Sequence, residues 1–156
     1  MGIIKNNDLD SQIKRLKDQK NRIVFTNGCF DVLHFGHISY LERAKAFGDI
    51  LVVGLNSDAS VRKLKGKSRP INPLEYRKKV LESLRFVDFV LPFDELTPEK
   101  LIKKIAPNFL VKGADYKKSE IIGSAFVESY GGKVATLDFV KGLSSSTILE
   151  KLGINQ

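Results

Sequence analysis

Short apolar runs alternate with amphipathic segments along most of this chain. Five runs have the length and the β-branched or aromatic content of buried strands, at 23–25, 50–55, 87–91, 109–111 and 134–137. Apolar residues at helical spacing predict helices at 8–20, 34–47, 72–84, 97–106, 120–130 and 144–152, with a short helical turn at 60–64. This alternation predicts an α/β fold: a doubly wound, mostly parallel, five-stranded Rossmann-like sheet with helices on both faces and right-handed crossovers.

Residues with capping preferences set the expected ends of several helices. Asn72 followed by Pro73, Thr97 and Ser119 are expected as helix starts, and Gly48 as a helix end. Within the 72–84 helix, Leu74, Val80, Leu81 and Leu84 are assigned to the inner face.

The chain is expected to form one domain over 1–156, with residues 1–21 as a helical extension across its outside. It has no apolar run of membrane-spanning length, and its N-terminus lacks the apolar core of a signal peptide. The single cysteine, Cys29, rules out an intramolecular disulfide and fits a reducing compartment. We therefore expect a soluble cytoplasmic protein without a membrane partner.

A formal net charge of +8 points to polyanionic partners. The lysines are spread along the whole chain, and neither zinc-finger spacing nor an aromatic RNA-binding strand is present. A nucleotide together with a sugar or polyol phosphate accounts for part of the charge, and a lysine-rich surface for much of the rest. No nucleic acid partner is expected.

The segment 23–37, IVFTNGCFDVLHFGH, carries the main functional signal. A strand, the turn at Asn27-Gly28 and a helix that begins at His34-Phe35-Gly36-His37 together form an anion site, because free backbone N–H groups and the helix dipole face the ligand. Two imidazoles three residues apart lie on one helical face and add donors to the same phosphate. Zinc held by Cys29 and the two histidines is an alternative, but no CxxC or second His/Cys cluster supports it.

Other polar segments also follow predicted strands. They are Asn56-Ser57-Asp58 with the cationic 63–70 segment, the 112–116 segment and the 140–146 segment. Ligands of doubly wound sheets bind outside the carboxyl ends of the strands, so these segments are expected to converge on one site.

Residues 26–37, TNGCFDVLHFGH, resemble the first signature of the HxGH nucleotidyltransferase superfamily, and Ser144-Ser145-Ser146 resemble its second, a Ser/Thr-rich helix start. From about residue 5 onward the chain is similar to one branch, the ADP-heptose synthase adenylyltransferases. The segments that carry this similarity are NSD at 56–58, RPINPLEYR at 69–77, VD at 87–88, PFDE at 92–95 and VKGADY at 111–116.

The resemblance implies transfer of AMP from ATP to a sugar 1-phosphate, D-glycero-D-manno-heptose 1-phosphate, with release of pyrophosphate and formation of ADP-heptose for surface polysaccharide. The attack is in line and has no covalent enzyme intermediate, so positioning and charge stabilisation dominate. Mg²⁺ is expected on the ATP phosphates, with no metal held by the protein itself. The kinase domain fused to this unit in many relatives is absent, and Met1 favours a free-standing enzyme, so a separate heptose kinase acts upstream. Relatives often form dimers, which implies a homodimer by analogy.

The resemblance also assigns roles to individual residues. The expected catalytic residues are His34, His37, Lys65 and Arg77. The expected ATP-binding residues are Thr26, Asn27, Gly28, Cys29, Phe30, Gly36, Lys112, Gly113, Asp115, Ser144, Ser145 and Ser146. The expected sugar-phosphate residues are Asp31, Asn56, Asp58, Arg69 and Tyr116. For Asp31, capping of the turn is an equally open interpretation.

The sequence departs from the branch at Ala114, where glycine is usual, at Ser145-Ser146, where Thr-Thr is more common, and at Thr147. A cytidylyltransferase acting on a polyol phosphate such as glycerol 3-phosphate is the alternative enzyme, although the RPINPLEYR and KGADY segments argue against it. Class I aminoacyl-tRNA synthetases also carry an HxGH-like motif. This chain, however, has no room for an anticodon-binding domain and no KMSKS-like loop.

Overall fold

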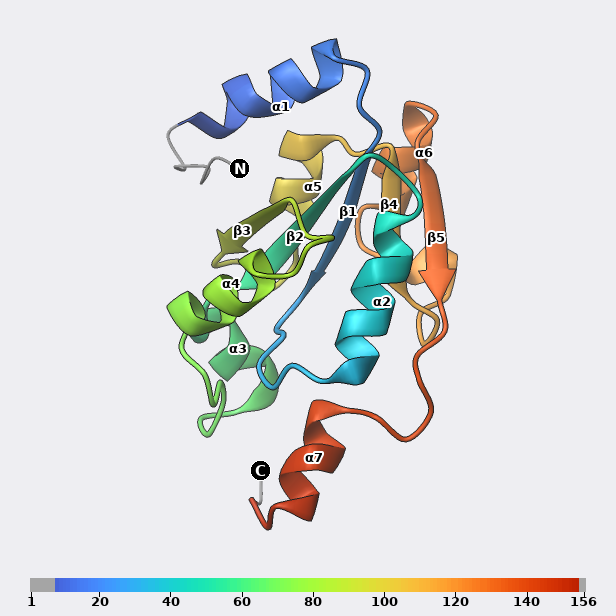
Figure 1. Cartoon of the computed structure of the whole chain (residues 1–156). Coiled ribbons are helices and arrows are strands. Elements are labelled where there is room, and N and C mark those ends of the chain that lie inside the picture. Colours follow the sequence, from blue (N-terminus) through green and yellow to red (C-terminus); the bar gives the residue numbers. More distant parts are fainter. Residues whose placement is uncertain (1–7, 155–156) are drawn as a thin grey trace.

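The computed structural model describes residues 8–154 and places a five-stranded parallel sheet at the centre of the molecule (Figure 1). The strand order is β3-β2-β1-β4-β5, and every neighbouring pair is parallel. The strands are β1 (Ile23–Gly28), β2 (Ile50–Asn56), β3 (Phe89–Phe93), β4 (Phe109–Gly113) and β5 (Lys133–Leu137). The predicted doubly wound, Rossmann-like fold is confirmed.

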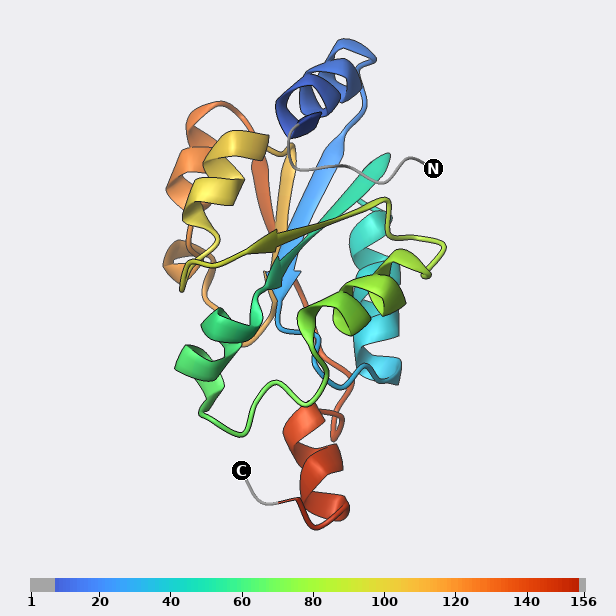
Figure 2. The same ribbon diagram turned by 90° about the vertical axis from the view of Figure 1, so that its left-hand side faces the viewer.

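Helices cover both faces of the sheet (Figures 1 and 2). They are α1 (Leu9–Asp18), α2 (Phe35–Lys45), α3 (Asp58–Lys65), α4 (Leu74–Glu82), α5 (Glu99–Ile105), α6 (Ser124–Ser129) and α7 (Ser145–Lys151), with a 3₁₀ turn, η2, at Lys118–Glu120. Side chains of α1, α5 and α6 pack in one core cluster with Ile23 and Phe25 of β1, whereas α2 and α4 pack in a second cluster with Val24. Alternate residues of β1 thus enter opposite clusters, as the two-residue period of a strand requires.

The order of the strands reverses beside β1, and the sheet opens there. β1 pairs with β2 along its whole length, from Ile23 to Gly28, but with β4 only at Val24 and Phe25. β4 continues to Gly113 in register with β5. The carboxyl ends of β1 and β4 are therefore separated at the topological switch point, which is where ligands bind in sheets of this kind.

Several predicted element boundaries were wrong. The predicted 120–130 helix is interrupted, because Gly123 has a φ of +86° and lies against Ile102 of α5, so that α6 begins only at Ser124. The predicted short turn at 60–64 is a full helix, α3, because Ser57 caps it by accepting a hydrogen bond from the Ser60 amide.

Helix α4 begins one residue later than predicted. Pro73 holds the N-cap position, and the Asn72 side chain instead donates to the Asp31 carbonyl. Val80, assigned to the inner face, is 48% exposed. Thr97 does not cap α5, whose N-cap position is held by Pro98. Ser119, expected as a cap, lies within η2.

No helix in the described part of the chain is long and apolar enough to cross a membrane. The part of the expected N-terminal extension before residue 8 lies outside the described residues.

Candidate active site

A cavity of about 520 Å³ lies at the carboxyl ends of the strands, where β1 and β4 separate. It is lined by residues from the segments after β1, β2 and β4 that were expected to converge. The predicted residues that line it are Asn27, Gly28, Cys29, Phe30, His37, Asn56, Lys65, Lys112, Gly113, Asp115 and Tyr116. The structure therefore gathers predicted residues from three separate segments around one cavity.

The rings of both histidines at the start of α2 accept hydrogen bonds from nearby backbone amides. Nδ1 of His34 accepts a hydrogen bond from the Gly36 amide at 3.1 Å, and Nδ1 of His37 accepts one from the His34 amide at 3.4 Å. In a neutral imidazole one nitrogen accepts and the other donates, so both rings are assigned a proton on Nε2. The Nε2 of His34 is buried and has no partner among the described residues, so the site holds an unused donor.

Both histidines are uncharged at neutral pH. Burial, followed by the charges of His34 and Lys65, lowers the pKa of His37 to about 4, and burial also lowers the pKa of His34. The ring centroids lie 3.9 Å apart, and a second proton on the His37 ring would be opposed by a charged His34 and by Lys65. The pair consequently offers neutral N–H donors.

The buried state of His37 predicts a specific loss of stability in acid. The unfolded state takes up this proton below about pH 6.5, whereas the folded state resists it until about pH 4, so stability is lost as pH falls through this window. Going from about pH 7 to about pH 4.5 should remove roughly 2–3 kcal/mol more from the wild type than from His37→Asn, which cannot titrate. Urea unfolding of both proteins at the two pH values measures the difference. Equal losses would show that His37 titrates normally.

Lys112 lines the cavity near the end of β4. Its ammonium donates to the Asn27 side-chain oxygen at 3.0 Å and lies 5.3 Å from the centre of the Tyr116 ring. Burial lowers the pKa of Lys112, although the carboxylate of Asp115 opposes that shift. A cation whose hydrogen-bond partner is a neutral amide oxygen suits an anionic ligand. Lys65 ends α3, is exposed and lines the same cavity.

Arg77 does not line this cavity, contrary to the sequence-based expectation of a cationic contact with the ligand. Its side chain is fully buried. The guanidinium donates to the carbonyls of Cys29 and Asn56 at 2.8 Å, to the Asn72 carbonyl at 2.9 Å and to the Asp58 carboxylate at 2.7 Å. This buried arginine network joins α4 to the segments that follow β1 and β2.

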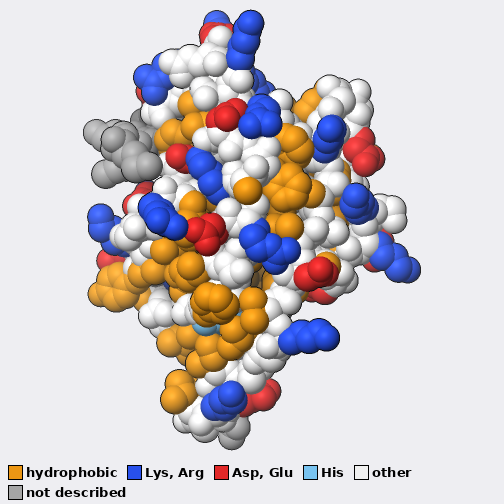
Figure 3. Space-filling model, turned by 45° about the vertical axis from the view of Figure 1, so that its right-hand side comes forward, with side chains coloured by type: hydrophobic (Ala, Val, Ile, Leu, Met, Phe, Trp, Pro, Cys, Tyr) orange, Lys and Arg blue, Asp and Glu red, His pale blue; other side chains and the backbone are white. Residues whose placement is uncertain are grey.

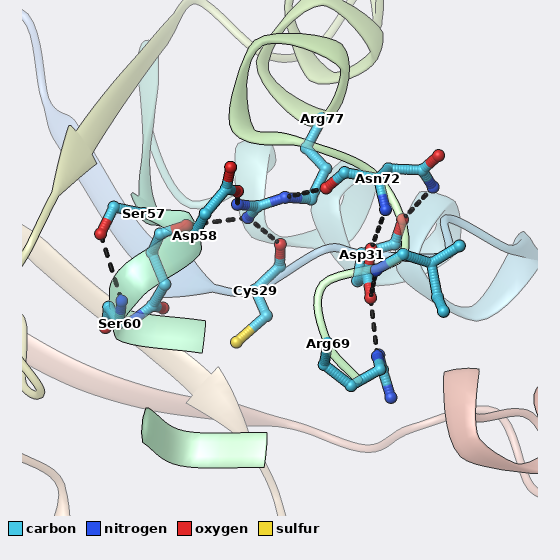
Figure 4. A network of polar contacts seen from close by, with 10 residues as sticks. Cys29, Asp31, Ser57, Asp58, Ser60, Arg69, Asn72 and Arg77 are labelled. Atoms are coloured by element: carbon cyan, nitrogen blue, oxygen red, sulfur yellow. Dashed lines mark hydrogen bonds and ion pairs between the residues drawn. The ribbon is translucent and has the colours of Figure 1, made fainter. Parts of the chain in front are cut away.

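Asp31 and Arg69, expected at the sugar phosphate, form a second buried pair (Figure 4). The Arg69 Nε lies 2.7 Å from the Asp31 carboxylate, and both side chains are almost inaccessible. Burial alone would raise the pKa of Asp31, but the Asn72 and Ile71 amides and the Arg69 guanidinium together hold that pKa below its ordinary value. Asp31 thus fixes the 69–72 segment, which agrees with the capping interpretation; Asp58 is likewise engaged by Arg77.

The serine segment lies beside the start of α2 and outside the cavity wall. Ser144 caps α7 by accepting from the Thr147 amide, and the Ser145 hydroxyl donates to the Val32 carbonyl at 3.0 Å. α7 lies beyond the carboxyl ends of the strands (Figure 1). Figure 3 shows hydrophobic side chains gathered around a histidine at this end of the molecule. Exposed hydrophobic side chains include Phe35 of α2, Phe139 after β5 and Leu152, which directly follows α7.

Residues 25–151 match the cytidylyltransferase-like family. The chain belongs to this family.

Curated relatives of this cytidylyltransferase-like protein are larger. It is 53% identical over 150 residues to the bifunctional protein HldE of Geotalea uraniireducens, a match that covers 96% of this chain and 31% of that protein. It is 56% identical over 137 residues to the bifunctional protein HldE of Campylobacter jejuni subsp. doylei, covering 88% and 29%. The chain thus spans about a third of these relatives. In structure it is similar to the lipopolysaccharide core biosynthesis protein of Thermoplasma volcanium, with 29% identity, a TM-score of 0.64 and coverage of 78% and 98%.

The cavity of this cytidylyltransferase-like protein also contains residues that the sequence did not single out. They are Tyr40, Leu64, Leu96, Thr97, Pro98, Glu120, Ile121, Ile122 and Phe139. Two signals were available for some of them: Tyr40 follows His37 by three residues on one helical face, and Leu96 to Pro98 follow the carboxyl end of β3.

The zinc alternative finds no support. In the described part of the chain, no three His, Cys, Asp or Glu side chains are arranged to hold a metal ion. Burial also raises the pKa of Cys29, against the opposing charges of Lys65, Arg77 and Arg69, so that its thiol stays protonated.

Proposed function

We propose that this chain transfers AMP from ATP to D-glycero-D-manno-heptose 1-phosphate and releases pyrophosphate and ADP-heptose. The observation that carries the proposal is the pair of neutral histidines at the start of α2, with the ring of His37 in a cavity that also holds Lys65 and Lys112. Roughly 50% identity to the HldE relatives over nearly the whole chain supports the choice of a heptose phosphate as the acceptor. The Thermoplasma volcanium protein is named for lipopolysaccharide core biosynthesis, which fits a product used for surface polysaccharide.

In this proposal the histidines and the α2 N-terminus hold the triphosphate. The Nε2–H groups of His34 and His37 donate to phosphate oxygens and stabilise the charge that develops as the α-phosphorus is attacked. The unused Nε2–H of His34 fits this role, because a buried donor without a partner costs free energy until a ligand supplies one. Because Gly36 has no Cβ, its backbone can lie close to the His34 ring. A Cβ at this position would lie 2.9 Å from that ring.

The remaining contacts follow from position. Lys112 and Lys65 neutralise phosphate charge, and Asn27, Gly28, Gly113, Asp115 and Tyr116 line the same cavity. Ser144, Ser145 and Ser146 add hydroxyl and amide donors to the terminal phosphates from beside α2. In an in-line transfer the protein positions two phosphates and needs no nucleophile of its own.

In this proposal Mg²⁺ enters the site with the nucleotide. No cluster of three or more carboxylate, histidine or cysteine side chains exists between residues 8 and 154 to hold it. When bound to ATP, the ion neutralises the charge of the leaving pyrophosphate. An upstream heptose kinase as a separate protein and a homodimeric assembly belong to the same proposal.

A panel of nucleotides and phosphorylated acceptors tests the reaction. We expect pyrophosphate release to require ATP, Mg²⁺ and the heptose 1-phosphate together, with far less release from CTP or from glycerol 3-phosphate. The family name favours CTP as the competing nucleotide, so both nucleotides are tested with both acceptors. Equal or faster turnover with CTP and glycerol 3-phosphate would reject the heptose assignment and leave a polyol-phosphate cytidylyltransferase.

A further inference from the structure

Side chains bridge the gap where the β1–β4 ladder stops. Backbone pairing between these strands ends at Phe25 and Leu110, yet both strands continue toward the cavity. One residue further on, the Tyr40 hydroxyl donates to the Val111 carbonyl at 3.1 Å and lies 2.8 Å from the Thr26 hydroxyl. Because the one phenolic proton goes to Val111, the Thr26 hydroxyl is the donor in the second contact.

The bridge adjoins residues that line the cavity, and Tyr40 itself lines it. Asn27 and Lys112, the next residue of each strand, are themselves joined by the hydrogen bond between the Lys112 ammonium and the Asn27 side chain. Tyr40 lies on α2 one helical turn after His37. One buried hydroxyl thus joins three elements: the helix that carries His37, the strand that carries Asn27 and the strand that carries Lys112.

We propose that Tyr40 is a positioning residue for nucleotidyl transfer, whose hydroxyl sets the spacing between His37 and Lys112, which both line the cavity. The inference rests on the proposed function, because it assumes that both residues contact phosphate groups during transfer. Tyr40 is 6% exposed, and its ring packs against Phe139 at 5.9 Å. Removal of the hydroxyl alone leaves the ring and its packing in place.

A purely structural hydroxyl would affect stability without affecting turnover, and the chain contains a matched control. The Tyr130 hydroxyl donates to the Pro107 carbonyl at 2.8 Å, and Tyr130 follows α6, outside the residues that line the cavity. Tyr40→Phe and Tyr130→Phe therefore make the same chemical change at a cavity site and at a distant site.

The experiment measures kcat and KM for ATP and for the acceptor, together with thermal stability, in both variants. Misplacement of a reacting group by about 1 Å can reduce the rate about a hundredfold, so we expect kcat of Tyr40→Phe to fall about tenfold to a hundredfold with little change in KM. Tyr130→Phe should keep the wild-type kcat. If the kcat values of the two variants are equal, Tyr40 has no positioning role.

Thr26→Val provides a second route that does not depend on the folding of Tyr40→Phe. It removes the other hydroxyl of the same bridge and, like Tyr40→Phe, should lower kcat. If both variants act through one bridge, the double variant loses little beyond the larger single loss, because coupled sites are not additive. The proposal would be overturned if the kcat losses of the two single variants multiply in the double variant, or if Thr26→Val keeps the wild-type kcat.

Failure of this inference can be told apart from failure of the proposed function. The wild type is first assayed on the nucleotide and acceptor panel, and the variants are compared on the transfer that it catalyses best. An inactive wild type counts against the proposed function. An active wild type with an equally active Tyr40→Phe counts against the positioning role alone.

Discussion

Replacement of His37 with alanine should abolish most of the turnover while the protein stays folded. His37 lines the cavity and is expected to donate an uncharged Nε2–H to the phosphate under attack. Loss of one donor aimed at developing charge typically costs about 10²–10³ in kcat. We therefore expect a fall of that order in pyrophosphate release with ATP and the heptose 1-phosphate, with a cooperative unfolding transition retained.

Two further variants separate the phosphate contact of His37 from its contact with the backbone. Nδ1 of His37 accepts from the His34 amide, whereas Nε2 is the proposed donor to phosphate. Asparagine carries its terminal groups near the Nδ1 position and glutamine carries them near Nε2. His37→Asn should keep the backbone contact and lose turnover as alanine does, and His37→Gln should recover part of the turnover. Turnover retained in His37→Ala, or recovered by asparagine instead of glutamine, would reject the phosphate role.

The sequence was sufficient to predict which residues lie at the carboxyl edge of the sheet. It was not sufficient to predict which of their side chains are free to contact a ligand. Five apolar runs gave the five strands, and the parallel connections fixed that the segments after β1, β2 and β4 meet at one edge. The cavity residues Asn27, His37, Lys65 and Lys112 were predicted on this basis. The decisive information was the periodicity of the chain and its connectivity, both of which a sequence displays directly.

The buried ion pairs show what a sequence cannot reveal about charged residues near a site. A sequence shows that Arg77, Arg69 and Asp31 carry charge close to the site, but not whether the protein itself neutralises that charge. In the structure Asp31 pairs with Arg69, and Arg77 is satisfied by Asp58 and three carbonyls. Their hydrogen-bonding capacity is used within the fold, which favours positioning of the loops over contact with substrate.

Tyr40 was missed for a related reason. An aromatic residue on the inner face of an amphipathic helix is ordinary core material, and its hydroxyl becomes informative only once the β1–β4 ladder is seen to stop below it. The periodicity of apolar residues does not show the Gly123 break either, which is a positive φ at a glycine that lies against Ile102 of a different helix. In both positions tertiary contacts decide what the local pattern leaves open.

Arg77→Met should lower the free energy of unfolding by about 3–5 kcal/mol, because it leaves buried groups without their partner. The substitution keeps an apolar stem of about the length of the arginine stem but removes the guanidinium, which donates to the Asp58 carboxylate and to the carbonyls of Cys29, Asn56 and Asn72. In a domain of this size the loss corresponds to a fall in the thermal midpoint of roughly 10 °C. Thermal and urea unfolding measure it.

Arg85→Met is the matched control for this prediction. Arg85 pairs with Glu42 at 2.9 Å, but its side chain is 85% exposed, and an exposed pair of this kind contributes at most about 1 kcal/mol. We expect the thermal midpoint of Arg85→Met to be close to that of the wild type. We expect Arg77→Met to retain turnover at temperatures below its lowered thermal midpoint, where the segments after β1 and β2 stay folded. The opposite result, an unchanged midpoint with turnover abolished in Arg77→Met, would show that Arg77 acts on the ligand directly. In that case the main role of Arg77 would be contact with the ligand and not stabilisation of the buried arginine network.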